Sequence, residues 1–267
     1  MELSEWVTGR VVIKIKGEPL EMEMTVPATP VNPRRMLPIF QQMSNGFVDL
    51  SVGEANKNGE RISCKKGCGA CCSQPVPISE VEAYNIAELV ESMPEPRRSE
   101  IRKKFADAVE HFSDMNWFDR MNEFATRPEP ENPDMQYKDV IEAGIEYFNE
   151  NIPCPFLEEG SCSIHQERPL ACREYLVMSP AENCSHPTAE GVRMVPLLLK
   201  PSRSLRAFAR TKDSPYLPVL PLIRALEFAE KYREDFEEKT GPEWAADFIG
   251  KLTGSEVATS GAGQRSE

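Results

Sequence analysis

The sequence lacks an excess of positive charge and lacks any long apolar run. Its 267 residues carry 31 Lys and Arg against 43 Asp and Glu, which gives a net charge of −12. A nucleic-acid binder needs a basic face to displace counterions from phosphates, so this balance argues against that class of protein. The longest strongly apolar run, residues 195–199, is far too short to cross a bilayer. The predicted partner is therefore an unknown protein or small molecule, with no nucleic acid and no membrane.

Several catalytic signatures are missing as well. No glycine-rich loop lies between a strand and a helix, and no G-x-S-x-G nucleophile elbow occurs. No pair of carboxylates stands out from the charged helix faces as a general acid and base. The first residues lack the basic region and apolar run of a secretory signal, so we expect a cytoplasmic protein. In that reducing compartment, clustered cysteines mark metal or redox sites more often than structural disulfides.

What the sequence does have is eight cysteines in two groups. The first group fits within residues 64–72, where lysines, glycines and an alanine separate the cysteines. Small, flexible residues allow several thiolates to converge on one point, which is what a soft metal requires. The sequence therefore predicts a metal site. The predicted metal ligands are Cys64, Cys68, Cys71, Cys72, Cys154, Cys162, Cys172 and Cys184.

The way these cysteines share metal stays open at this point. Zinc and iron–sulfur clusters each take about four cysteine ligands, so eight thiols can form two sites, or one site with spare thiols. Cys71 and Cys72 are adjacent and project in different directions, so we expect them to serve two metals, or one metal and a free thiol. Four disulfides are less favoured, because no secretory signal is recognised and the chain is large enough to bury a core. A metal-free thiol relay is disfavoured to a similar degree.

Two arginines flank Cys172. A guanidinium near anionic thiolates stabilises their charged form, so Arg168 and Arg173 are predicted to help bind the cofactor. His165, three residues after Cys162, is an alternative ligand, and His186 is a weaker one.

The predicted fold is mainly α, with a small N-terminal β-hairpin and an irregular, cysteine-ligated metal-binding core (α+β). Apolar residues alternate with polar ones over residues 6–26, which predicts the hairpin. Residues 152–186 show no helical period and contain several prolines, so metal rather than hydrophobic burial is expected to fix them. Residues 192–200 are expected to be extended. Apolar residues at helical spacing predict helices over residues 34–52, 79–92, 97–126, 133–149, 219–239 and 242–252.

These elements predict four parts. We expect an N-terminal hairpin and helix, a cysteine-cluster metal-binding domain, a C-terminal helical segment and a tail without order. The corresponding ranges are residues 1–57, 58–190, 191–252 and 253–267.

The cysteine motifs carry a resemblance to a known family. Residues 64–72, 154–157, 160–164 and 168–173 resemble the CxxCxxCC cysteine-cluster family of putative zinc- or iron-chelating proteins, which is similar to flagellin lysine N-methylase. Two positions depart from the pattern: three residues separate Cys64 from Cys68 where the family name implies two, and His165 stands where we expect a tyrosine. The resemblance implies that the matched cysteines bind zinc or an oxygen-sensitive iron–sulfur cluster. It implies methyl transfer only weakly.

The sequence thus predicts a cytoplasmic metalloprotein whose cysteines bind an iron–sulfur cluster or zinc. Redox chemistry and methyl transfer are the enzymatic hypotheses. The alternative hypothesis is a structural zinc-binding module that binds another protein and has no catalytic activity.

Overall fold

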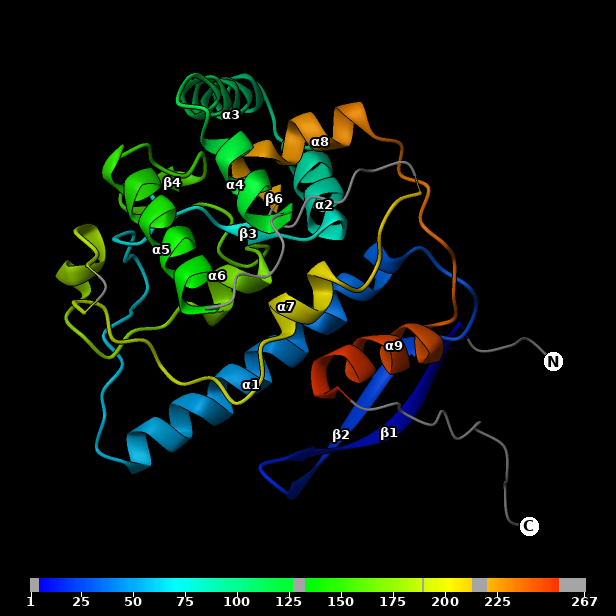
Figure 1. Ribbon diagram of the computed structural model, residues 1–267. Coiled ribbons are helices and arrows are strands. Elements are labelled where there is room, and N and C mark those ends of the chain that lie inside the picture. The colour runs from blue at the N-terminus through cyan, green and yellow to red at the C-terminus, as the bar shows by residue number, and fades with distance from the viewer. Residues whose placement is uncertain (1–4, 127–132, 189, 213–219, 255–267) are drawn as a thin grey trace, which may run out of the picture.

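The computed structural model describes residues 5–126, 133–188, 190–212 and 220–254 (Figure 1). The chain is mainly helical with short antiparallel strand pairs, which confirms the predicted fold class. The long helix α1 (Leu37–Lys57) crosses the middle of the molecule, with the hairpin and α9 (Gly241–Thr253) on one side. The helices on the other side are α2 (Glu80–Glu91), α3 (Arg97–Asp114), α4 (Trp117–Thr126), α5 (Pro133–Asn149) and α8 (Ala225–Lys231).

The predicted hairpin is confirmed. Strands β1 (Trp6–Ile15) and β2 (Glu18–Pro27) pair antiparallel along their whole length. Lys16 and Gly17 connect them with φ angles of 52° and 89°, the positive values that a tight two-residue hairpin turn requires. Ile13, Met24 and Val26 are buried on the face that packs against the body, so this alternating pattern buries one side of the hairpin.

Helix α2 begins where the sequence predicted. Ser79 Oγ accepts a hydrogen bond from Glu82 N at 3.1 Å, and Glu82 Oε2 accepts one from Ser79 N at 2.8 Å. This reciprocal pair is a capping box, which satisfies two backbone N–H groups that a helix start otherwise leaves without partners. The Glu82 side chain is fully inside the protein, and its other oxygen accepts from Leu170 N at 2.8 Å. One glutamate therefore links the start of α2 to the cysteine segment.

Two predicted helices differ from the structure. The single helix expected over residues 97–126 is two helices, α3 and α4, because Asn116 between them has a φ of 52°, a left-handed conformation that ends a helix. The helix expected over 219–239 is wrong beyond Lys231, where Tyr232 turns extended and its carbonyl accepts a hydrogen bond from Tyr84 Oη at 3.0 Å. Its described start is not helical either, since β6 (Leu220–Pro221) pairs with β3 (Pro77–Ile78) before a 3₁₀ turn. Residue 219 lies outside the described residues.

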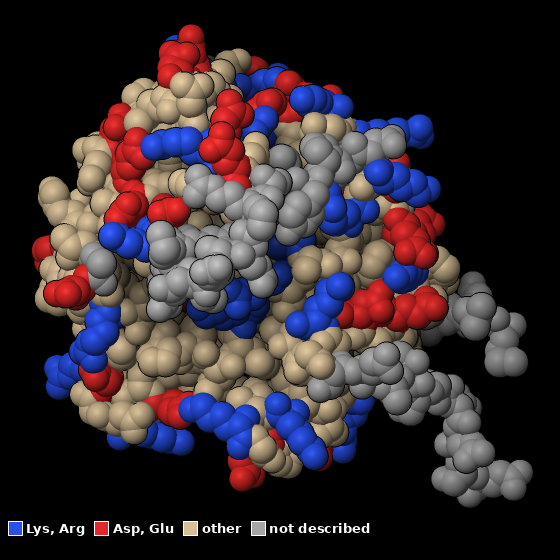
Figure 2. Space-filling view, viewed as in Figure 1, with Lys and Arg blue, Asp and Glu red and all other residues tan. Residues whose placement is uncertain are grey.

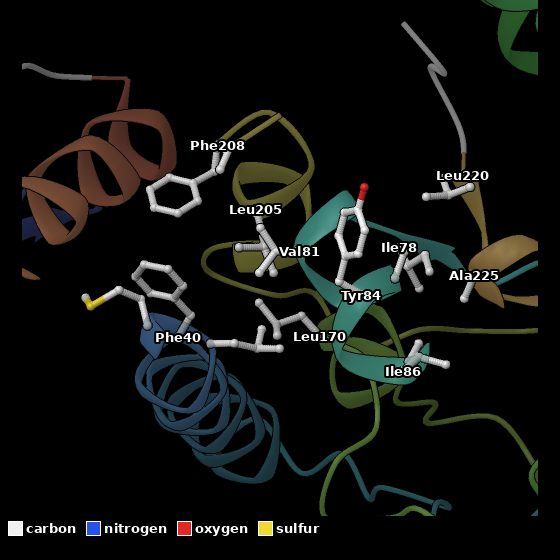
Figure 3. Packing of buried hydrophobic residues seen from close by; sticks show 14 of the residues in the cluster. Phe40, Ile78, Val81, Tyr84, Ile86, Leu170, Leu205, Phe208, Leu220 and Ala225 are labelled. Atoms are coloured by element: carbon white, nitrogen blue, oxygen red, sulfur yellow. The ribbon is translucent and has the colours of Figure 1, made fainter. Parts of the chain in front are cut away.

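One hydrophobic core joins distant parts of the chain. Phe40 on α1 stacks on Phe248 of α9 with ring centroids 4.1 Å apart, and Phe208 meets the Phe40 ring edge-on at 5.0 Å. Figure 3 shows Val81 of α2 and Leu170 directed into the same space. The three predicted ordered parts share this core, and their division stays a prediction. Residues 255–267 of the predicted tail lie outside the described residues.

A short helix after the cysteine segment, α7 (Pro201–Arg206), was not predicted. It packs against α1 and α9 and contributes the buried Leu205 to the core. Within the described residues, no helix combines the length and apolar character that crossing a bilayer would need.

Candidate metal centre

All eight cysteines line one cavity of about 110 Å³, which we call the thiol cavity. Its cysteines come from both sequence groups, so the fold does bring together side chains that stand up to 120 positions apart in the chain (184 − 64 = 120). The thiols that line it are Cys64, Cys68, Cys71, Cys72, Cys154, Cys162, Cys172 and Cys184.

Short elements and turns form the walls. Cys64 to Cys72 lie on consecutive turns, Cys162 ends the strand pair β4 (Leu157–Glu158) and β5 (Ser161–Cys162), and two short helices hold the last two thiols. Cys172 lies on α6 (Leu170–Glu174) and Cys184 on a 3₁₀ turn, residues 181–185.

Backbone contacts join the early and late segments. Cys154 N donates to Cys72 O at 2.6 Å, and Ser63 N donates to Val177 O at 2.9 Å. Gly69 is packed so closely that a Cβ there would lie 2.7 Å from Gly160 O, a contact that real Cβ atoms do not make. Gly69 is therefore needed for the early and late cysteine segments to approach each other.

Hydrophobic anchors also fix the cysteine segment. Phe156, Ile164 and Leu170 are 1%, 3% and 0% exposed and belong to the main core. The expectation that metal, and not burial, fixes residues 152–186 is therefore wrong, because apolar side chains between the cysteines hold this segment to the body.

The thiols divide into two sets around Cys71. Cys184 interacts electrostatically with Cys64, Cys68 and Cys71, so the last cysteine of the chain lies with the first group. We call Cys64, Cys68 and Cys184 the outer set.

Cys172 interacts with Cys154, Cys162 and also Cys71. We call Cys154, Cys162 and Cys172 the inner set. Cys71 is therefore the thiol that both sets share, and its neighbour Cys72 is bonded through its carbonyl to the backbone of Cys154.

The surroundings favour neutral thiols. Burial raises the pKa of Cys154 to about 12 and that of Cys184 to about 11. A hydrogen bond with Cys72, and then burial, raises the pKa of Cys71 strongly. Repulsion between neighbouring thiolates acts in the same direction, so several of these sulfurs ionise together only when a cation compensates their charge.

All eight cysteines are free thiols, with no disulfide between them. In the part of the chain that the structure describes, no three Cys, His, Asp or Glu side chains meet at the spacing of a finished metal site. The thiols line a shared space instead of closing on a point.

The two predicted arginines lie in different surroundings. Arg168 lines the thiol cavity, and its Nε is buried without a hydrogen-bond partner among the described residues. Burial raises the pKa of Cys64 and Cys162, and a hydrogen bond with Cys72 raises that of Cys71. The charge of Arg168 partly offsets each of these increases. A buried donor without a partner, facing thiols, fits an anionic group such as a metal–thiolate centre.

Arg173 is not among the residues that line the cavity. Its Nε donates to Arg168 O at 3.0 Å, its Nη1 donates to Asn45 Oδ1 at 3.1 Å, and its Nη2 donates to Gln166 O. These bonds hold the turn that carries Arg168. Its observed contacts therefore support a positioning role, and direct cofactor binding by Arg173 stays a prediction.

The sequence missed two polar residues of the site, Tyr175 and Gln74, which line the thiol cavity. Burial raises the pKa of Tyr175, and the neighbouring Cys184 acts in the same direction. In the sequence, the only indication that Tyr175 belongs to the site was its position three residues after Cys172. His165 also lines the cavity, whereas His186 is not among its lining residues.

A known family model matches the region that forms the thiol cavity. Residues 63–189 match the family model CxxCxxCC, described as a putative zinc- or iron-chelating domain. We call this matched region, which is similar to that family, the CxxCxxCC domain. This CxxCxxCC domain includes all eight cysteines and Arg168, and its description agrees with the predicted zinc or iron–sulfur cofactor. No significant match was found among curated proteins or among solved structures. The similarity to flagellin lysine N-methylase rests on the sequence resemblance alone.

Proposed function

We propose that the CxxCxxCC domain binds an iron–sulfur cluster in the thiol cavity and that the protein acts in cytoplasmic redox chemistry. The observation that carries this proposal is one cavity of about 110 Å³ lined by all eight cysteines. A single water needs roughly 10–15 Å³ by the same measure, so this space suits a group of several atoms better than one ion.

A single zinc ion fits this arrangement less well. Structural zinc sites are tetrahedral and closed by four ligands, which would leave half of the eight thiols unused. The inner and outer sets instead both border the same cavity and both interact with Cys71. A larger centre can use ligands from both sets.

The residues of the chain would bind and tune such a centre. The thiols of the two sets would supply the ligands, and Arg168 Nε would donate a hydrogen bond that stabilises their negative charge. The apolar side chains of Phe156 and Ile164, which also line the cavity, would keep water away and strengthen that interaction. An iron–sulfur cluster supplies one-electron chemistry when bound.

Metal and sulfide analysis after anaerobic purification tests this proposal. We expect iron together with acid-labile sulfide, and a brown sample whose visible absorption fades on reduction. A colourless sample with stoichiometric zinc and no sulfide would overturn the proposal and support the structural zinc module that binds another protein.

Methyl transfer is the second hypothesis, and the resemblance to flagellin lysine N-methylase is its support. Titration of the metal-loaded protein with S-adenosylmethionine tests it directly. Saturable binding would support methyl transfer, and the absence of binding would remove it.

A further inference from the structure

A second cavity, of about 220 Å³, lies directly beside the thiol cavity. Gln74, Val76 and Tyr175 line both cavities, so these three side chains form the wall between them. A molecule in the second cavity would therefore lie next to the proposed metal centre.

Three positive side chains line the second cavity. Lys200, Arg203 and Arg206 come from α7 and the residue before it. Their side chains form no hydrogen bond or ion pair with another residue that the structure describes, although Glu82 and Glu174 attract Arg206 at longer range. Figure 2 shows Lys and Arg side chains gathered near the middle of this face, where Figure 1 places α7. In a chain with a net charge of −12, three such cations at one cavity need an explanation.

The acidic residue among the described lining residues is already bonded. Glu174 Oε1 accepts a hydrogen bond from Ser202 N, and Glu174 Oε2 accepts one from Ser202 Oγ, both at 2.6 Å. This carboxylate holds the start of α7, so it does not form an ion pair with the lysine and arginines. The cavity has more positive than negative side chains.

Five of the lining residues are apolar. Val76, Pro77, Ala171, Met194 and Leu197 face the cavity. Met194 is 43% exposed, which is unusual for a large hydrophobic residue of this protein. A flexible methionine at the open side of a cavity can adapt to the body of a bound molecule.

We propose that this second cavity binds a small organic anion next to the thiol cavity. Its carboxylate or phosphate group is held by Lys200, Arg203 and Arg206, and its apolar body rests on Met194. Charge-assisted hydrogen bonds from lysine and arginine to oxyanions are among the strongest contacts available to such a ligand. Tyr175 separates this ligand from the thiols. The inference does not depend on which metal the thiols bind.

Isothermal titration at low salt tests the site, with phenyl phosphate, phenylacetate and inorganic phosphate as the probes. We expect saturable binding of at least one of the two organic anions, tighter than that of inorganic phosphate and weakened by added salt. The K200A/R203A variant, which changes two exposed side chains, should bind the preferred probe at least about ten-fold more weakly. Comparing the two organic probes shows whether the site prefers phosphate or carboxylate.

The matched control is Arg233→Ala, an exposed arginine that is not among the lining residues, and it should bind like the parent protein. Met194→Ala should weaken binding of the organic probes and leave inorganic phosphate unchanged. Thermal unfolding checks that each variant is folded, and Arg203→Lys, which keeps the charge, should retain most of the binding.

Absence of saturable binding by all three probes, or equal binding by the parent and the K200A/R203A variant, would overturn the inference. Metal content is measured on the same samples and should not change in these variants. A protein that binds anions but contains no iron would contradict the proposed function and support the anion site. A protein that contains iron but binds no anion would support the proposed function and contradict the anion site.

Discussion

The helical body and the thiol cavity are built from different interactions. In the body, aromatic and aliphatic side chains from α1, α2 and α9 pack into one core, as Phe40 and Phe248 illustrate. Around the cavity the elements are only two to five residues long, and hydrogen bonds between segments set their positions. Apolar residues such as Phe156, Ile164 and Leu222 both line the cavity and belong to the core, so they fasten the cavity to the body. A rigid body can thus hold loops whose own sequence has little structural preference.

The largest effect is expected from removing the thiol that both sets share. Cys71→Ala should lower metal affinity by more than about 100-fold, because even residues that only support a metal ligand contribute 10- to 100-fold. Cys68→Ala is the matched variant, since Cys68 acts on Cys64 and Cys184 within the outer set and its removal should cost less. Metal analysis after dialysis and circular dichroism measure both. Equal metal content in Cys71→Ala and the parent protein would show that the two sets do not share a centre.

A substitution in the core of the helical body should have the opposite pattern, lowering stability without lowering metal binding. Phe248→Ala removes a fully buried ring stacked on Phe40, and should lower the free energy of unfolding by about 3–5 kcal/mol. Metal bound per folded molecule should stay the same, because Phe248 does not line the thiol cavity. Denaturant unfolding measures the free energy of unfolding, and metal analysis of the folded fraction measures the metal bound per molecule. A loss of metal in proportion to the loss of stability would mean that the two regions do not behave separately.

Glu82 joins the two regions, so its replacement should affect both. Glu82→Ala leaves Ser79 N and Leu170 N without their buried acceptor, at a cost of about 1–3 kcal/mol for each unsatisfied group. Leu170 is two residues before Cys172, so metal affinity should fall too. Glu82→Gln keeps one acceptor oxygen, so its stability and its metal affinity should lie between those of the parent protein and Glu82→Ala. Denaturant unfolding and chelator competition measure these two quantities. An unchanged metal affinity in Glu82→Ala would restrict this link to stability.

The effect of pH is expected to be small over a fraction of a pH unit and to accumulate over a wider range. The pKa values of Cys154 and Cys184, about 12 and about 11, lie above neutrality, so protons compete with metal for these thiols. Metal affinity should therefore rise with pH across about pH 6 to 9 without a plateau, by about 1.4 kcal/mol per pH unit for each thiol that loses its proton. Chelator competition at several pH values measures it. An affinity that levels off near neutral pH would mean that the ligands are thiolates before metal arrives.

The sequence predicted the parts that follow simple periodicity. The alternation over residues 6–26 and the capping box at Ser79 correspond directly to the hairpin and to α2. Periodicity did not reveal that Asn116 turns left-handed, because the apolar stripe continues past it into α4. Nor did it reveal that the chain becomes extended at Tyr232, where a contact with Tyr84 decides the conformation. Such contacts span 148 positions and leave no local pattern.

For the site, the cysteines were evident and their grouping was not. Sequence spacing places Cys184 with the late cysteines, whereas the fold places it with Cys64 and Cys68. Arg168 and Arg173 look equivalent in the sequence, yet one lines the cavity and the other bonds to backbone carbonyls. The direction in which a side chain leaves a short turn depends on the neighbouring segments, and spacing alone does not contain that information.

The hydrogen bond from Cys154 N to Cys72 O ties the two cysteine segments together through backbone atoms alone. It needs neither a thiolate nor an ion, so the pocket can be assembled while the polypeptide is still in its apo form. Maturation would then consist of inserting the metal centre into a preformed apo site.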